Sequence, residues 1–562
     1  MVVEKEVVKA LESAGLEDAE KLIEVPPQPE LGDLALPCFE LAKKDKMSPA
    51  QIAEEFSKKI KIPKGGTISR IETKAGYVNF FLNWEKIAES ILKQIGKGLK
   101  VDSGKRKKIM VEYSQPNPVH PMHIGHSRGT FLGDALAKIL EFVNFKVVKA
   151  NYMNDTGLQV AKLVTAYELW AKGKTPEGKP DLWLWELYVK FHEEAGKDSA
   201  LEDKARETLR KFELEKDPAT LKQWNQIVKW CVEGFEQTYK KLGISFDDYL
   251  YENNFRADGK KNVEKLISKG YANKNEEGAV VTDLEKFGLT NTIILRSDGT
   301  GLYHTSDLGM TPYKFEKYKL DRAIWVVSSE QNLYFKQLFK MLELLDYKWF
   351  ENCHHFSFEL VRLPEGKMSS REGRAVMLDE VVSKLVQLAY DEINKRNLNL
   401  EDSEKRSIAE KVGIGALKYA IVKIEPARMI TFDWNRMLSL EGDTGPYLQY
   451  AHTRCAGIIK KAGEWKPNFK TEKLMGQEEV LIKLLANFSN IIENAAKDLR
   501  PHYICNYAFD LATALDKFYE ACPVLKAKNE NLKNFRLTLV DSVKTILKIA
   551  LNLVGIEALE KM

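Results

Sequence analysis

The 562-residue chain is 44% hydrophobic and 30% charged, which is the balance of a globular protein and enough length for about three or four domains. Its 85 basic and 81 acidic residues leave a net charge of +4, so the total charge does not decide for or against a nucleic-acid partner. The chain has no run of 18 apolar residues, the length that a membrane-spanning helix needs. Its mixed-charge N-terminus lacks the pattern of a signal or transit peptide. We therefore expect no membrane association and a cytoplasmic location.

The cysteines are scattered singly along the chain, and no pair has the C-x-x-C spacing of a structural zinc site. This distribution is typical of reduced, mostly buried thiols. We expect no structural metal. The six cysteines are Cys38, Cys231, Cys353, Cys455, Cys505 and Cys522.

The first part of the chain predicts a small α+β domain. Helical periodicity precedes the strand-like "YVNFFLNW" at 77–84, and the basic, Gly-containing "GKGLKVDSGKRKK" at 96–108 has the composition of a linker. The apolar "IMVEYS" at 109–114 then predicts a strand, and a helical pattern covers about 124–142. From about 160 the sequence is helical, Trp-rich and charged, which predicts a helical insertion.

Strand patterns return in the second half of the chain, in "GAVVTDL", "TIILRS", "RAIWVVSS" and "HHFSFELVRL". Strands separated by helices favour a parallel α/β sheet. From about 375 to the end the pattern is helical almost throughout.

Three histidines fall within the seven residues "HPMHIGH", between the strand at 109–114 and the helix that follows. A helix start offers free backbone N–H groups and a partial positive charge, so it binds anions readily. His123 and His126 lie on one face of the first turn, and Gly125 leaves room for a flat base. Gly129 and Gly133 continue a small-residue stripe that predicts close packing on the sheet.

Two other interpretations of this cluster are a metal site and ordinary structural histidines. The H-E-x-x-H pattern of helical zinc enzymes is absent, and no third ligand is evident. A nucleotide-phosphate site is favoured because of a second motif, "GKMSSREGR" at 366–374. Its basic residues between two glycines could close on a triphosphate, although alone it could equally be a solvated loop.

Together, H-I-G-H and K-M-S resemble the paired motifs of class I aminoacyl-tRNA synthetases. "VEYSQPNPVHPMHIGHSRG", "NYMNDTGLQ", "LYHTSDLGM", "VVSSEQNLYF" and "EGDTGPYLQYAHTR" are similar to segments of the arginyl-tRNA synthetases, and the resemblance covers nearly the whole chain. It implies ATP-dependent attachment of L-arginine to tRNA(Arg) through arginyl-adenylate, with release of AMP and pyrophosphate. It also implies ATP with Mg2+ as substrate, tRNA bound before the adenylate forms, and a monomer.

The resemblance implies a multidomain fold with four parts. Residues 1–95 would form an N-terminal α+β domain that contacts tRNA. Residues 105–375 would form a Rossmann-type catalytic domain with a helical insertion at about 160–290. Residues 376–440 would be a helical connecting region, and residues 441–562 an all-α anticodon-binding domain.

The resemblance also implies an arginine pocket, and the charge of the ligand supports it. A guanidinium needs carboxylates in a matched planar geometry, which lysine would fit less well. Glu252 could be a further acid of this pocket. The residues that the resemblance places there are Glu112, Asn117, Tyr303, Asp307 and Gln331.

For ATP, the resemblance gives catalytic roles to His123, His126, Lys367 and Arg371. His120 stands where relatives often have lysine, and Ser370 stands at a lysine of the full K-M-S-K-S motif, which leaves open the cation that faces the β,γ-phosphates. We favour Lys367, assisted by Arg371. The full ATP-binding set is His120, His123, Gly125, His126, Glu330, Lys367, Met368, Ser369 and Ser370.

The helical C-terminal part mixes aromatic, polar and basic side chains, which can stack on and bond to unpaired anticodon bases. Helix packing is an equal alternative for its tyrosines. Two rival functions also remain, a different class I synthetase such as a lysyl enzyme and a catalytically silent tRNA-binding relative. The expected tRNA-binding residues are Tyr447, Gln449, Tyr450, His452 and Arg454.

Overall fold

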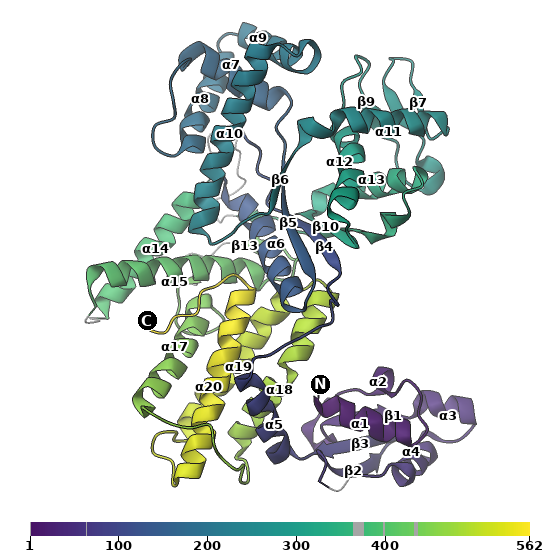
Figure 1. Ribbon diagram of the computed structural model, residues 1–562, viewed down its shortest axis with the longest axis vertical. Helices are drawn as coiled ribbons and strands as arrows, with labels where there is room; N and C mark the ends of the chain where they lie inside the picture. The colour runs from purple at the N-terminus through teal and green to yellow at the C-terminus, as the bar shows by residue number, and fades with distance from the viewer. Residues whose placement is uncertain (1, 63–64, 363–375, 397–399, 432–436) are drawn as a thin grey trace.

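A computed structural model describes residues 2–62, 65–362, 376–396, 400–431 and 437–562. A parallel sheet lies at the centre of the molecule (Figure 1). Helices inserted between its strands extend to one end, and the C-terminal helices and the N-terminal unit lie toward the other. No helix among the residues described is long and apolar enough to cross a membrane.

The N-terminal unit is an antiparallel three-stranded sheet, ordered β1-β3-β2, with helices packed on it. The predicted strand at 77–84 is confirmed as β3, whose Val78 and Phe80 are buried. The helix that leaves this unit, α5, packs against the C-terminal helices. The elements are α1 (Val2–Ser13), α2 (Ala19–Leu22), β1 (Leu34–Pro37), α3 (Phe39–Asp45), α4 (Pro49–Lys59), β2 (Ile68–Lys74), β3 (Tyr77–Leu82) and α5 (Trp84–Gly96).

The central sheet is entirely parallel, with the strand order β11-β10-β4-β5-β6, so the predicted parallel α/β sheet is confirmed. Helix α6 (Ile124–Phe142) follows β4 and packs on β4, β5 and β10. A Cβ atom on Gly133 would lie 2.3 Å from Cβ of Tyr113, so this glycine permits the close packing that the sequence predicts. The strands are β4 (Lys108–Glu112), β5 (Lys146–Met153), β6 (Asp248–Tyr251), β10 (Arg322–Ser328) and β11 (Cys353–Phe358).

The helical insertion begins directly after β5 and contains four long helices before β6 (Figure 1). The chain then forms α11, a small sheet, α12 and α13 around the other flank of the central sheet. These helices are α7 (Leu158–Trp170), α8 (Pro180–Ala195), α9 (Ala200–Arg210), α10 (Pro218–Lys241), α11 (Arg256–Ser268), α12 (Tyr303–Tyr318) and α13 (Asn332–Leu344).

The expectation that all four later strand patterns join the parallel sheet is wrong for two of them. "GAVVTDL" and "TIILRS" form β8 (Val280–Thr282) and β9 (Ile293–Leu295), which pair with β7 (Ala272–Lys274) in a separate antiparallel sheet. The connections between these short strands hold no crossover helix, and parallel pairing needs one or a similarly long connection. The other two patterns form β10 and β11.

The described part of the C-terminal region is helical, as predicted, except for β13 (Ile430–Thr431), which pairs with β12 (Val361–Arg362). Helix α15 packs against α6, so the C-terminal helices contact the helix that begins at the histidine motif. The helices are α14 (Leu378–Lys395), α15 (Asp402–Val422), α17 (Gly445–Ala462), α18 (Gly476–Lys497), α19 (His502–Ala521) and α20 (Glu530–Leu553).

Candidate functional site

Two adjoining cavities open at the carboxyl ends of β4 and β10, which is where parallel α/β sheets bind ligands. Their volumes are about 280 Å³ and about 320 Å³, and both are lined by Gln115 and Val327. Ser114 and Gln115 have φ angles of 80° and 50°, in the left-handed region that costs energy for residues other than glycine. The chain therefore turns sharply between the two cavities.

Buried hydrogen bonds hold this turn in place. The Ser114 hydroxyl lies 2.7 Å from both the Thr130 hydroxyl of α6 and the Tyr239 hydroxyl of α10. The Gln115 backbone N–H donates to Asn151 Oδ1 of β5 at 3.1 Å. The turn after β4 is thus held by three surrounding elements, and no sequence pattern predicts these partners.

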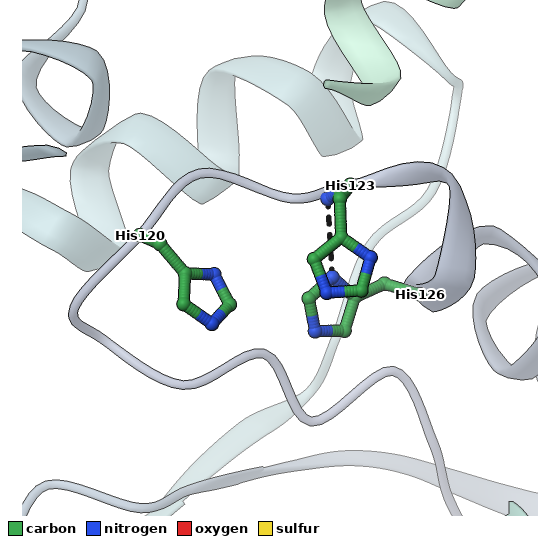
Figure 2. Close-up of side chains that lie close together, drawn as sticks. All are labelled: His120, His123 and His126. Carbon is green, nitrogen blue, oxygen red and sulfur yellow. Dashed lines mark hydrogen bonds between the residues drawn. The ribbon is translucent and has the colours of Figure 1, made fainter. Parts of the chain in front are cut away.

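The larger cavity is lined by His123, Gly125, His126 and Gly129. His123 caps the N-terminus of α6, because its Nδ1 accepts the Gly125 N–H at 3.1 Å. His126 Nδ1 accepts the His123 N–H at 3.1 Å, the dashed line in Figure 2. Since backbone N–H groups occupy both Nδ1 atoms, the proton of each neutral ring is on Nε2.

Both rings are neutral at physiological pH. Burial, reinforced by the nearby His120, lowers the pKa of His123 to about 4. Burial lowers the pKa of His126 well below its ordinary value, and His123 and His120 lower it further. Each ring can therefore offer one Nε2–H donor to a phosphate oxygen without carrying a charge.

His123 and His126 lie close to His120. One ring nitrogen of each residue lies within 4.8 Å of the others, which is close enough for the three to share a metal ion. The hydrogen bonds argue against such a site. Metal ligation needs a free lone pair, and Nε2 of His123 and His126 carries a proton instead. Only His120, whose Nδ1 donates to Pro121 O at 3.0 Å, leaves an Nε2 lone pair.

His120 occupies a different position from the other two histidines (Figure 2). It is buried, lines neither cavity, and packs edge-on against Trp185 of the helical insertion with ring centroids 6.0 Å apart. Glu330, another expected ATP-binding residue, is exposed and also lines neither cavity.

Five other expected residues lie outside the described part of the chain: Lys367, Met368, Ser369, Ser370 and Arg371. The segment that follows them is paired with the histidine motif. Ile124 N–H donates to Val376 O at 3.0 Å, and Leu378 N–H donates to Met122 O at 2.8 Å. The two motifs of the sequence are thus connected through their flanking backbone.

The smaller cavity brings together side chains from the end of β4, the start of α12 and the end of β10. Tyr303 stands at its rim with 55% of its surface exposed, and the Asn154 amide donates to its hydroxyl at 3.1 Å. All five residues expected to bind arginine line this cavity, namely Glu112, Asn117, Tyr303, Asp307 and Gln331.

Asp307 gives this cavity a buried negative charge. The Tyr334 hydroxyl donates a short hydrogen bond to Asp307 Oδ2. Burial raises the pKa of Asp307 to about 6, against the opposing effect of Lys314. The carboxyl group is therefore mostly ionised at neutral pH. Glu252 lies elsewhere, since it lines a neighbouring cavity and accepts hydrogen bonds from Tyr152 at 2.8 Å and Ser306 at 2.9 Å.

Several residues that line or support this cavity were not anticipated from the sequence. Lys314 is fully buried, with Nζ 2.5 Å from Glu112 Oε2. Asp307 and Lys314 are seven residues apart, which puts them on one face of α12. This spacing is the sequence feature that could have indicated Lys314 as a neighbour of the cavity. The lining residues that were missed are Gln115, Tyr152, Asn154, Trp325, Val327, Tyr334 and Phe335.

The residues expected to contact tRNA on α17 have different surroundings. Gln449 and His452 are buried, and they donate to Glu557 O at 2.9 Å and to Leu559 O at 2.8 Å in the C-terminal tail. Tyr450 is 40% exposed. The remaining two, Tyr447 and Arg454, are partly buried and contact Asp516 of α19.

Comparison with protein families gives three matches along the chain. Residues 1–82 match the arginyl-tRNA synthetase N-terminal domain, and residues 87–434 match the catalytic domain of class I tRNA synthetases (R). Residues 448–562 match the DALR anticodon-binding domain.

Similar proteins extend over almost the full length. The chain is 38% identical to the arginine–tRNA ligase of Clostridium acetobutylicum over 548 residues, 96% of each chain. It is 36% identical to that of Clostridioides difficile over 558 residues, which covers 98% of this chain and 97% of the relative. The structure of Thermus thermophilus arginyl-tRNA synthetase superposes with a TM-score of 0.84 at 28% identity, covering 100% of this chain and 99% of the other.

Proposed function

The chain belongs to the arginyl-tRNA synthetase family, whose members are class I arginine–tRNA ligases, and from that premise we propose how its two cavities divide the reaction. The smaller cavity takes L-arginine, and the larger takes ATP. The arginine carboxylate attacks the α-phosphate of ATP, which gives arginyl-adenylate and pyrophosphate. A terminal ribose hydroxyl of tRNA(Arg) then takes the arginyl group and releases AMP.

The observation that carries this proposal is the shared wall between the cavities. Gln115 and Val327 line both, so ligands in the two cavities would meet there. Holding two reactants in contact contributes much of the rate in such a transfer, because no bimolecular encounter is then needed.

In the smaller cavity, Asp307 pairs with the guanidinium of arginine. Glu112, Tyr303 and Gln331 line the same cavity, and Asn117 is near the α-amino end of the ligand. The cavity also has apolar walls, including Trp325, that exclude water from the charged pair. A compact ammonium would leave part of this polar set unpaired, which favours arginine over lysine.

In the larger cavity, the Nε2–H groups of His123 and His126 donate to phosphate oxygens. Gly125 and Gly129 have no side chain to block a flat base or sugar. ATP arrives as its magnesium complex, which neutralises part of the phosphate charge. Lys367, assisted by Arg371, stabilises the charge that develops on the leaving pyrophosphate.

The DALR domain at 448–562 recognises the anticodon of tRNA(Arg), and the N-terminal unit contacts the same tRNA. Of the expected residues on α17, the exposed Tyr450 is the one best placed to stack on a base. We also propose that the enzyme works as a monomer in the cytoplasm and that tRNA must bind before arginyl-adenylate forms.

Amino-acid-dependent exchange of pyrophosphate into ATP tests this division of roles. With tRNA(Arg) present, arginine should support exchange, and lysine and other amino acids should not. Without tRNA, arginine should support little exchange. Exchange supported equally by lysine would favour a different class I synthetase, and no exchange with any amino acid would favour a catalytically silent relative.

A further inference from the structure

Two carboxylates line the arginine cavity, although its ligand brings only one net positive charge. Glu112 is 3% exposed and Asp307 is 8% exposed. Two unpaired carboxylates in one buried site repel each other, so one of them would take up a proton near neutral pH. A nearby cation would offset this repulsion.

Lys314 is that cation. It projects from α12, its side chain has no exposed surface, and its Nζ lies 2.5 Å from Glu112 Oε2. The same Nζ lies 5.1 Å from the ring centroid of Trp325, which lines the cavity. Lys314 itself does not line the cavity, so we place it behind Glu112 rather than among the groups that contact arginine.

The other charged or titratable groups near Lys314 and Asp307 are Cys353, Glu252 and Arg256. Asp307 lies on the same face of α12 as Lys314 and interacts with it electrostatically. The Cys353 thiol of β11 also interacts with Lys314. Glu252 acts on Asp307 too, but Arg256 lies 3.6 Å from Glu252 and offsets its charge.

We propose that Lys314 is a positioning residue for arginine recognition, which pairs with Glu112, offsets its charge and leaves Asp307 as the single uncompensated carboxylate for the guanidinium. This inference rests on the proposed function of the cavity. The cavity then has a net charge of −1 when empty, which matches the net charge of +1 on the arginine zwitterion. Glu112, with one oxygen on Lys314, keeps its other oxygen toward Gln115, whose amide lies 3.3 Å away.

The variant Lys314→Met removes the ammonium but keeps an unbranched side chain of similar length. Asp307 then loses the cation that opposes the rise of its pKa and keeps the repulsion of Glu112, so its pKa rises further and arginine meets a partly protonated Asp307. We expect the KM for arginine at pH 7 to rise about tenfold or more, since one pKa unit corresponds to a factor of ten. The fall in kcat/KM at low pH should move upward by about one unit.

Charging of tRNA(Arg) by the full-length enzyme across pH 5.5–9 gives these values, with thermal unfolding as a check of folding. The KM for ATP and the kcat at saturating arginine should stay within about threefold, since Lys314 lines neither cavity. Lys314→Arg should restore much of the arginine KM because it keeps the charge. Lys317→Met is the matched control on the same helix, where Lys317 pairs with Asp248 at 2.9 Å, and its pH profile should match that of the wild type.

The double variant Lys314→Met/Glu112→Gln keeps the test decisive if Lys314→Met folds poorly. Removing the unpaired carboxylate should return the pH midpoint toward the wild-type value, even if the KM stays high. An unshifted midpoint in Lys314→Met, or equal loss of kcat and of ATP binding, would overturn the role of Lys314. A wild-type enzyme that does not charge arginine would instead overturn the proposed function itself.

Discussion

At the scale of single residues, backbone hydrogen bonds determine what the histidine motif can do. The Gly125 and His123 N–H groups occupy Nδ1 of His123 and His126, so both rings present Nε2–H donors. This arrangement suits phosphate oxygens and does not suit a metal ion. The sequence places these imidazoles at a helix start, but their tautomers follow only from the folded geometry.

Asp307→Asn should raise the KM for arginine by roughly 100-fold, because a neutral amide cannot pair with a buried guanidinium. The wild-type enzyme should itself lose kcat/KM for arginine as the pH falls through about 6, where burial places the pKa of Asp307. Steady-state charging at several pH values measures both effects. Asp346→Asn, a change at an 82% exposed side chain, is the control, and an arginine KM unchanged in Asp307→Asn would contradict its role.

Lys367→Ala should lower pyrophosphate exchange by about 100-fold or more, the effect of losing one group that stabilises developing charge. Arg371→Ala should have a smaller effect, because we assign it an assisting role. Exchange rates at saturating arginine, ATP and tRNA provide the comparison. Near-normal exchange in Lys367→Ala would reject its role and would leave Arg371 as the principal cation.

At the scale of elements, the position of α6 sets the position of the histidines. Gly133→Ala places a Cβ 2.3 Å from Tyr113 Cβ, so the helix must move from the sheet. We expect a loss of roughly 1–3 kcal/mol in the free energy of unfolding, together with weaker ATP binding. Gly96→Ala in α5, where a Cβ meets nothing within 4 Å, should cost nothing. Equal unfolding midpoints for the two variants would contradict this packing argument.

On α17, burial separates residues that support the fold from residues that can reach RNA. Gln449→Ala should lower the unfolding midpoint, because it removes the amide that donates to Glu557 O of the C-terminal tail and to Lys411 O of α15, at a cost of roughly 1–3 kcal/mol. Tyr450→Ala should leave that midpoint unchanged and weaken tRNA binding. Thermal unfolding and tRNA titration distinguish the two, and the reverse pattern would show that the assignment is wrong.

At the scale of the whole molecule, the C-terminal tail ties the helical region to the catalytic part. Lys418 of α15 donates to Gly555 O at 2.8 Å and to Leu242 O, at the end of the helical insertion, at 2.6 Å. Burial lowers the pKa of Lys418 to about 8. Lys418 therefore connects the C-terminal tail and the end of the helical insertion, two elements that are far apart in the sequence.

The sequence was sufficient for elements whose pattern is long or lies beside a motif, such as β4, α6 and β10. It placed β8 and β9 in the wrong sheet, because a short apolar run does not identify its pairing partner. It grouped the five residues of the arginine cavity through the family resemblance. It could not identify Lys314 or the buried role of Gln449, since polar residues on helices usually face solvent and only tertiary contacts bury them.

The most direct test of this account is the charging of total tRNA by the purified chain with each amino acid and ATP. Arginine alone should be attached, the charged species should be tRNA(Arg), and AMP and pyrophosphate should form in equal amounts with the product. Attachment of another amino acid at a comparable kcat/KM, or arginine attachment that does not depend on ATP, would contradict it.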